Sequence, residues 1–298
     1  MSNKSEMLKV SVCVVTYNQE KYIEECLLSI VNQATEFELE IIVGDDCSTD
    51  STPKIIERLA GVYKNITPIL RTKNIGGSEN YIDVHSRATG DYVCHCDGDD
   101  FWLSGKLNSQ VSILNSQPDC NIVWTRAKLL STDGCINDDG TPADFTNEKL
   151  YRGDLIKYMA VAVNSSVMYR AIKLEREEVE FDVLDWLINV NKVGDGYGTF
   201  ASEKPLTVYR TFVGVSSNGT IVRELILKTL EHFVIKYKNN KSDIALVALS
   251  SAYSCFKRKL FKLGLQFVVI FLYNTSLSNV TKIYTYLKEI SHLKIKKK

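Results

Sequence analysis

The residues best equipped for chemistry are the three carboxylates of Asp97-Gly98-Asp99-Asp100. Charges this close repel one another, so such a turn needs a cation or hydrogen-bond donors to be stable. Carboxylate oxygens suit Mg²⁺ or Mn²⁺, and Mg²⁺ commonly takes one or two carboxylates together with substrate phosphates. An EF-hand does not fit, because Phe101 follows the turn and the loop glycine and terminal glutamate of that motif are missing. A metal site on Asp97 and Asp99 and an exposed acidic turn both stay open.

Two more polar clusters follow apolar runs. Thr16-Tyr17-Asn18 comes after the first run, and residues 45–50, beginning with Asp45 and Asp46, come after the second. Turn chemistry alone could explain one such cluster, since Asp, Asn and Ser favour loops. Three clusters at the carboxyl ends of strands instead predict a ligand site, because open α/β sheets bind ligands there.

Short apolar runs alternate with helical patterns over residues 9–130, which predicts an α/β domain with a mainly parallel sheet. The expected strands are Val10–Val15, Ile41–Val43, Ile66–Leu70 and Tyr92–Cys96. Three helices are expected between them. The first has Asn18 as N-cap and an apolar stripe of Tyr22, Cys26, Leu27, Ile30 and Val31. The second starts at the N-cap Thr52 before Pro53, and the third covers Ser78–Ala88 and is closed by Gly90.

The rest of the chain has a weaker pattern. Residues 131–163 are rich in Asp, Gly, Asn and Thr and predict long loops. Regular elements are expected at Ser165–Tyr169 (strand), Leu184–Val193 (helix) and Leu206–Tyr209 (strand), and from Ile221 onward the pattern is helical. We therefore expect a main domain over residues 1–220 and a helical C-terminal extension over 221–298.

Composition narrows the class of protein. The 298 residues are 45% apolar, and 36 Lys and Arg balance 36 Asp and Glu, which excludes a globally basic nucleic-acid binder. The eight cysteines are too sparse for a disulfide scaffold and form no CxxC pair, so Cys94-His95-Cys96 reads as buried thiols rather than a metal site. Residues 1–9 lack the apolar segment of a signal peptide. Reduced cysteines without an export signal predict the cytoplasm.

In combination these segments resemble the inverting family 2 glycosyltransferases, which have the GT-A fold. The resemblance covers about residues 9–215, and the order and separation of its pieces make it specific. The matching pieces are residues 10–18, 40–52, 74–77, 88–92 and 97–102, followed by Lys106, Leu107 and Gln110.

The resemblance implies a nucleoside diphosphate sugar donor, UDP-linked in our reading, and a divalent metal, Mg²⁺ or Mn²⁺. Asp97 and Asp99 match the DxD element, with Asp99 as the direct ligand of the ion that bridges the diphosphate. The implied donor-binding residues are Thr16, Tyr17, Asn18 and Asp46 around base and ribose, Asp45 supporting that loop, and Asn74 and Gly76 flanking the donor. Taken by itself, Tyr17 could also be a packed core residue.

An inverting transfer also needs a general base that removes a proton from the acceptor hydroxyl. In the family this is an acidic residue at the start of a helix in the second half of the domain. Asp185, just before Trp186, matches best, and Asp182 is the alternative. Either carboxylate could also be a plain helix N-cap.

Two further pieces resemble the acceptor side of these enzymes. Residues 164–170 are similar to the strand of small residues that borders the acceptor pocket, and Tyr209-Arg210 is similar to a Tyr-Arg pair after the base helix. Phe212 stands where a histidine commonly follows, so a histidine contact is not expected here. Arg210 is expected to bind substrate, and a structural ion pair fits it equally well.

The extension beyond residue 220 lies outside the resemblance. Residues 263–281 carry no charge, but their continuous apolar part is about half of the ~20 residues that a spanning helix needs. Basic residues stand before it (Lys257, Arg258, Lys259, Lys262) and at the chain end (Lys294, Lys296, Lys297, Lys298). This pattern fits peripheral contact with an anionic membrane, or an ordinary helical subdomain with a basic tail.

The expected activity is transfer of one sugar, with inversion, to a saccharide or lipid-linked saccharide acceptor in surface polysaccharide or glycolipid assembly. One alternative is a nucleotidyltransferase, which would place a Gly-rich, Arg-containing phosphate loop after the first strand, where residues 15–18 have none. The other is a nucleotide-sugar-binding protein without catalysis.

Overall fold

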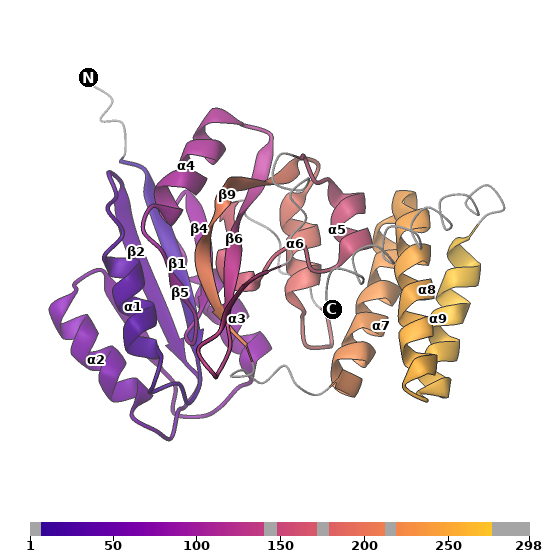
Figure 1. Cartoon of the computed structure of the whole chain (residues 1–298), viewed down its shortest axis with the longest axis horizontal. Coiled ribbons are helices and arrows are strands. Elements are labelled where there is room, and N and C mark those ends of the chain that lie inside the picture. Colours follow the sequence, from indigo (N-terminus) through magenta and orange to yellow (C-terminus); the bar gives the residue numbers. More distant parts are fainter. Residues whose placement is uncertain (1–6, 140–147, 172–178, 212–218, 276–298) are drawn as a thin grey trace. The chain divides into compact units, whose positions relative to one another are not determined.

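The computed structural model describes residues 7–139, 148–171, 179–211 and 219–275. The chain divides into two compact units (Figure 1). The first consists of Met1–Arg152 and Ala160–Ser217, and the second of Gly153–Met159 and Asn218–Lys298. The boundary of a catalytic domain at residue 220 stays a prediction.

The first unit begins with four parallel strands in the order β3-β2-β1-β4. They are β1 (Lys9–Thr16), β2 (Glu38–Asp45), β3 (Ile66–Leu70) and β4 (Tyr92–Asp97), and they alternate with α1 (Ile23–Val31), α2 (Thr52–Val62) and α3 (Gly77–Ser86). Val10, Val12 and Val14 on one face of β1 and Ser11 and Cys13 on the other are all fully buried, as expected for a central strand covered on both faces. The predicted α/β class with a mainly parallel sheet is confirmed.

Strand register brings the three polar clusters to one edge of this sheet. Thr16 pairs with Asp45 at the end of β1, and Val15 pairs with Asp97. Because all three strands run in the same direction, the loops that follow them leave the sheet together. The sequence-based expectation of a shared edge therefore holds for residues 16–18, 45–50 and 97–100.

The second half of this unit extends the sheet with strands of mixed direction. It contains β5 (Phe101–Trp102), α4 (Lys106–Ser116), β6 (Cys120–Leu130), β7 (Ile136–Asp138), the 3₁₀ turn η2 (Asn164–Ser166), β8 (Met168–Arg170), α6 (Asp185–Val193) and β9 (Tyr197–Arg210). Strand β8 lies antiparallel between β4 and β6, and β9 runs parallel to β6 and antiparallel to β5. These pairings bring β9 back to the residues that follow the acidic turn.

Several expected boundaries were wrong. Asn18 does not cap α1, which begins after Tyr22, because Asn18 has a left-handed backbone (φ 52°) and lies in the preceding loop. Thr52 is the first residue of α2 rather than its N-cap, and its N–H donates to Asp50 Oδ1 at 2.9 Å. The expected strand Ser165–Tyr169 is a 3₁₀ turn followed by the short β8, and Leu206–Tyr209 is the end of the long β9.

The segment expected to be loops also holds regular structure. Within residues 131–163 lie β7 and the helix α5 (Arg152–Tyr158), while residues 140–147 fall outside the described chain. Isolated short elements such as the three-residue β7 carry too little periodicity to stand out from loop composition.

The second unit is helical, as expected. It contains α7 (Gly219–Lys236), the short η3 (Lys238–Asn240), α8 (Lys241–Lys257) and α9 (Phe261–Asn274). Phe233, Val247 and Phe267, one from each long helix, are fully buried. Gly264 lets α9 approach α8 closely, since a Cβ there would lie 2.7 Å from the Phe256 ring. Within the described residues, no helix has both the length and the apolar composition needed to cross a bilayer.

Candidate active site

The loops after β1 and β2 are joined into one structure by side chain to main chain hydrogen bonds. The Asp45 carboxylate accepts from the Ser48 N–H at 3.0 Å and from the Ser48 hydroxyl. The Asn18 N–H donates to Ser48 Oγ at 2.8 Å, and Asn18 Oδ1 accepts from the Thr49 N–H at 2.8 Å. Tyr17, between these anchors, exposes 41% of its surface, so its ring is free to stack on a ligand and core packing does not describe it.

Asp46 connects this structure to the loop before α3. Its carboxylate accepts from the N–H groups of Ile75 at 2.8 Å and Gly76 at 2.9 Å, and its own carbonyl accepts from Asn74 Nδ2 at 3.0 Å. Gly76 adopts φ 91°, a conformation that favours glycine. Three of the predicted donor residues, Asp46, Asn74 and Gly76, therefore lie together, and the buried Asp46 carboxylate positions their loop.

The acidic turn lies against the end of β1 because Gly98 has no side chain. The Gly98 N–H donates to the Val15 carbonyl at 2.9 Å, and a Cβ on Gly98 would lie 2.8 Å from Thr16 Cβ and closer still to Gln19 Oε1. The close approach brings Asp97 and Asp99 next to the loop that holds Tyr17.

We expect Gly98→Ala to lower the free energy of unfolding by about 1–3 kcal/mol, as overpacking does at a tight contact. Gly61→Ala is the matched control, because nothing lies within 4 Å of a Cβ there. Alanine at this position in α2 should stabilise the chain by about 0.5–1 kcal/mol. Urea unfolding measures both, and a Gly98→Ala protein as stable as the wild type would contradict the packing described here.

The three carboxylates of the turn have different surroundings. Asp100 is fully buried and accepts from Ser165 Oγ at 2.5 Å and from the Arg210 N–H at 2.8 Å. Burial and the neighbouring Asp97 charge raise the pKa of Asp100 well above its usual range. The same two causes raise the pKa of Asp99 to about 6. For Asp97, burial is outweighed by His95 and Ser165, so its pKa is lowered.

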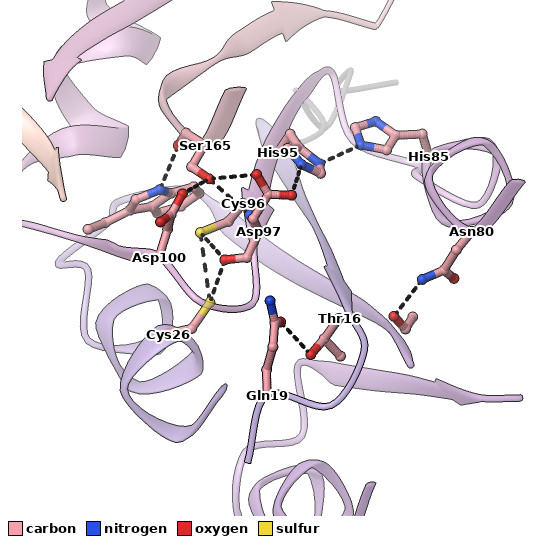
Figure 2. A network of polar contacts seen from close by, with 12 residues as sticks. Thr16, Gln19, Cys26, Asn80, His85, His95, Cys96, Asp97, Asp100 and Ser165 are labelled. Atoms are coloured by element: carbon pink, nitrogen blue, oxygen red, sulfur yellow. Dashed lines mark hydrogen bonds and ion pairs between the residues drawn. The ribbon is translucent and has the colours of Figure 1, made fainter. Parts of the chain in front are cut away.

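Asp100 is thus a structural carboxylate, whereas Asp97 and Asp99 hold negative charge that a cation could neutralise. Figure 2 shows Asp97, Asp100 and Ser165 turned toward one another. Among the described residues, no group of three or more His, Cys, Asp or Glu side chains is arranged to hold a metal ion. An ion on Asp97 and Asp99 would therefore need additional oxygen ligands from a substrate or from water.

Arg210 closes the turn from β9. Its guanidinium donates to the Asp99 carbonyl and to the Glu25 carboxylate, and it lies 4.8 Å from the Tyr22 ring centroid and 4.9 Å from that of Phe101. The structure places this predicted substrate-binding residue beside the acidic turn. The contacts of its side chain are with the protein, which is the structural ion pair that the sequence also allowed.

A buried polar cluster, two of whose residues lie on α4, contacts Ser165 and Ser166 of η2, and Ser165 in turn donates to Asp100 of the acidic turn. The role of this cluster was not predicted. Trp102 Nε1 donates to the Ser165 carbonyl at 2.8 Å, and Gln110 Nε2 donates to the Ser166 carbonyl at 2.9 Å. Lys106, fully buried, donates to Gln110 Oε1 at 2.7 Å, and burial lowers its pKa to about 8. The signal in the sequence was a Lys and a Gln four residues apart on one helix face.

Asp185 is the first residue of α6, and its Oδ1 accepts from the Trp186 N–H at 2.8 Å. Burial raises the pKa of Asp185, and the charge of Asp97 raises it further. The loop before it is tied to α3 by the Val183 N–H, which donates to Ser78 Oγ at 2.9 Å. Asp182, the alternative base, is exposed.

Tyr209 of β9 lies in the electrostatic field of the same carboxylates. Burial raises the pKa of its hydroxyl to about 12, and the charges of Asp100, Asp97, Asp99 and Asp185 contribute to the rise. The predicted metal-binding residues and the predicted base therefore lie within electrostatic reach of one residue.

Comparison with known proteins places this geometry in a family. The model of Glycosyl transferase family 2 matches residues 11–172, more than half of the chain. The chain belongs to glycosyl transferase family 2. The predicted family membership and the GT-A fold are thereby confirmed.

Relatives of this family 2 chain come from bacterial species. An uncharacterized protein of Mycobacterium tuberculosis is 34% identical over 203 residues, covering 67% of this chain and 58% of the relative. The poly(ribitol-phosphate) beta-glucosyltransferase of Bacillus spizizenii is 41% identical over 177 residues, covering 58% of this chain and 27% of the relative. The match thus spans well under two thirds of the length of either relative.

Solved structures share the fold. Staphylococcus aureus TarS 1–349 in complex with UDP has a TM-score of 0.61 at 21% identity, covering 80% of this family 2 chain and 70% of TarS 1–349. The Pyrobaculum calidifontis mannosyltransferase PcManGT, in complex with GDP-Man and Mn²⁺, has a TM-score of 0.57 at 18% identity, covering 94% and 80%. At these identities the likeness shows the fold alone.

Proposed function

We propose that the chain is an inverting glycosyltransferase that moves one sugar from a UDP-linked donor to a hydroxyl of a saccharide or lipid-linked saccharide acceptor. The observation that carries the proposal is the convergence of residues 16–18, 45–50 and 97–100 at one edge of the sheet, with Asp46 joined to the loop of Gly76. Family membership supports sugar transfer, and TarS, solved with UDP, supports the nucleotide. The poly(ribitol-phosphate) beta-glucosyltransferase supports a role in surface polysaccharide or glycolipid assembly.

Each group has a task in this proposal. Tyr17 stacks on the base, while Thr16, Asn18, Asp45, Asp46, Asn74 and Gly76 shape the loops around the nucleoside, and Arg210 keeps the acidic turn closed on the donor. Asp97 and Asp99 would hold Mg²⁺ or Mn²⁺, in line with the Mn²⁺ of PcManGT. When bound, such an ion offsets the diphosphate charge and stabilises the departing nucleotide. Asp185 takes the proton from the acceptor hydroxyl as that oxygen attacks the anomeric carbon.

We assign catalysis to residues 1–220 and peripheral membrane contact to the extension 221–298. Four exposed apolar side chains follow one face of α9: Phe261, Leu265, Val269 and Leu272. Exposed Lys257, Lys259 and Lys262 stand at its N-terminal end, where they could meet anionic lipid headgroups. We place the reaction in the cytoplasm, because all eight cysteines are free.

A screen of nucleotide sugars tests the proposal. The readouts are calorimetric binding with and without Mn²⁺ and slow release of the nucleotide in the absence of acceptor. We expect metal-dependent binding and hydrolysis of a UDP-sugar, and a preference for a GDP-sugar would correct the donor. Binding without hydrolysis, and without transfer to any acceptor, would favour the non-catalytic alternative. No binding of any nucleotide sugar would refute the proposal.

A further inference from the structure

Three side chains, two buried and one partly buried, form a chain of hydrogen bonds behind Asp97 and come from three elements of the first unit. His95 Nε2 lies 3.1 Å from Asp97 Oδ1, and His85 Nε2 lies 3.1 Å from His95 Nδ1. The Tyr169 hydroxyl contacts His85 Nδ1. His95 is fully buried in β4, and Tyr169 of β8 is 2% exposed. Figure 2 shows His85, His95 and Asp97 in line.

The hydrogen bonds of this chain can all be made in one direction. A carboxylate only accepts, so His95 donates from Nε2 to Asp97 and can accept at Nδ1 from His85 Nε2. His85 can then accept at Nδ1 from the Tyr169 hydroxyl. In this arrangement both ring nitrogens of each imidazole have a partner.

The surroundings favour a neutral His85. Burial, the neighbouring His95 and the charge of Lys192 lower the pKa of His85 well below its usual range. Lys192 Nζ lies 4.0 Å from the Tyr169 ring centroid, and the Tyr81 ring stacks on His85 at 3.9 Å.

We propose that Tyr169, His85 and His95 are positioning residues that fix the orientation of the Asp97 carboxylate for the donor and its divalent ion. This inference rests on the proposed function. The Asp97 side chain is one-third exposed. Its other oxygen, Oδ2, has only a long contact of 3.4 Å with Ser165 Oγ, so the 3.1 Å contact with His95 Nε2 is the shortest one that holds the carboxylate. Partners that orient the ligands of a metal are worth about 10–100-fold in metal affinity or activity when removed.

The sharpest test removes one oxygen at the far end of the chain. Tyr169→Phe keeps the buried ring but leaves His85 Nδ1 without its donor. Tyr92→Phe is the matched control, because Tyr92 is also buried in the sheet, where it pairs with β1. Its hydroxyl donates to Asn115 Oδ1 at 2.6 Å, away from Asp97. We expect Tyr169→Phe to weaken Mn²⁺-dependent UDP binding about 3–10-fold, less than the roughly 10–100-fold of a direct partner of a metal ligand, because Tyr169 acts through two histidines. UDP binding in chelator should not change, and Tyr92→Phe should match the wild type in both conditions.

Nitrogen-15 spectra of the histidine rings test the chain without any ligand. We expect a neutral His85 ring with its proton on Nε2, and we expect Tyr169→Phe to shift the Nδ1 signal of His85 and, through it, the signals of His95. Unshifted His95 signals in Tyr169→Phe, or equal Mn²⁺-dependent UDP affinities in Tyr169→Phe and Tyr92→Phe, would overturn the inference. If the wild type binds no UDP with Mn²⁺, the proposed function fails, and the spectra alone decide whether the one-directional chain exists.

Discussion

Asp185→Asn should abolish sugar transfer while leaving donor binding nearly intact. Asparagine keeps the size of the side chain and can still accept from the Trp186 N–H, but it cannot take a proton from an acceptor hydroxyl. Loss of a general base typically costs about 10²–10⁴-fold in rate. The turnover number should fall by that factor, and the calorimetric affinity for the UDP-sugar should change little.

Asp182→Asn is the matched control, because this residue lies three positions away, is exposed, and was the alternative base. It should transfer sugar at nearly the wild-type rate. The reverse result, with Asp182→Asn inactive and Asp185→Asn active, would move the base to Asp182. Unchanged turnover in both variants would remove the proposed role from this segment.

Asp99→Asn should remove metal-dependent donor binding. Asp99 is buried beside Asp97, and the loss of one of two carboxylates takes away half of the charge offered to the ion. We expect at least about a 10²-fold loss of Mn²⁺-dependent UDP affinity, comparable to removing a metal ligand or its main support. Chelation of the wild type should reproduce this loss, and added Mn²⁺ should restore the wild type but not the variant.

Asp138→Asn, on the exposed strand β7, is the control for removal of an acidic residue and should bind as the wild type does. Transfer that persists in chelator would argue against a metal on Asp97 and Asp99. Full activity of Asp99→Asn would argue against this residue as the ligand.

Although Asp99→Asn should weaken donor binding, it should stabilise the metal-free protein. The pKa of Asp99 is about 6 in the folded chain, against a reference value of 3.8, so the folded state holds this proton more tightly than the unfolded state. Rising pH therefore lowers the free energy of unfolding through this group, between about pH 4 and pH 6, by up to about 3 kcal/mol. Metal-free Asp99→Asn should melt above the wild type at pH 7.5 and level with it near pH 4. An equal difference at both pH values would contradict the raised pKa.

The first half of the fold could be predicted because its elements carry clear periodicity. Strand β1, for example, is an apolar run apart from Ser11 and its two ends and is covered on both faces, and β3 was predicted with its observed bounds. Strand β6 was missed, since Asn121, Arg126 and Lys128 interrupt its apolar residues. The beginning of β9 was missed for a similar reason, because Glu203, Lys204 and Pro205 read as a break.

The sequence predicted which residues form the candidate site, but not which other residues of the chain they contact. A motif identifies Asp97 and Asp99, but whether Arg210 faces a ligand or Glu25 depends on how β9 returns to α1, which no local pattern encodes. His85 and His95 stood in the sequence as ordinary residues of a helix and a strand. Their alignment behind Asp97 arises from contacts between elements that are distant along the chain.

The return of β9 also determines when this protein can finish folding. Asp100 receives the Arg210 N–H across 110 residues of chain, and Phe101 pairs with Val208 in the sheet. During synthesis, Asp100 is therefore made about a hundred residues before its partner Arg210. Contacts between residues so far apart in the sequence form slowly. Truncated chains that end before Tyr197 should remain open and prone to aggregation. Recombinant versions of the first unit should accordingly extend through Arg210.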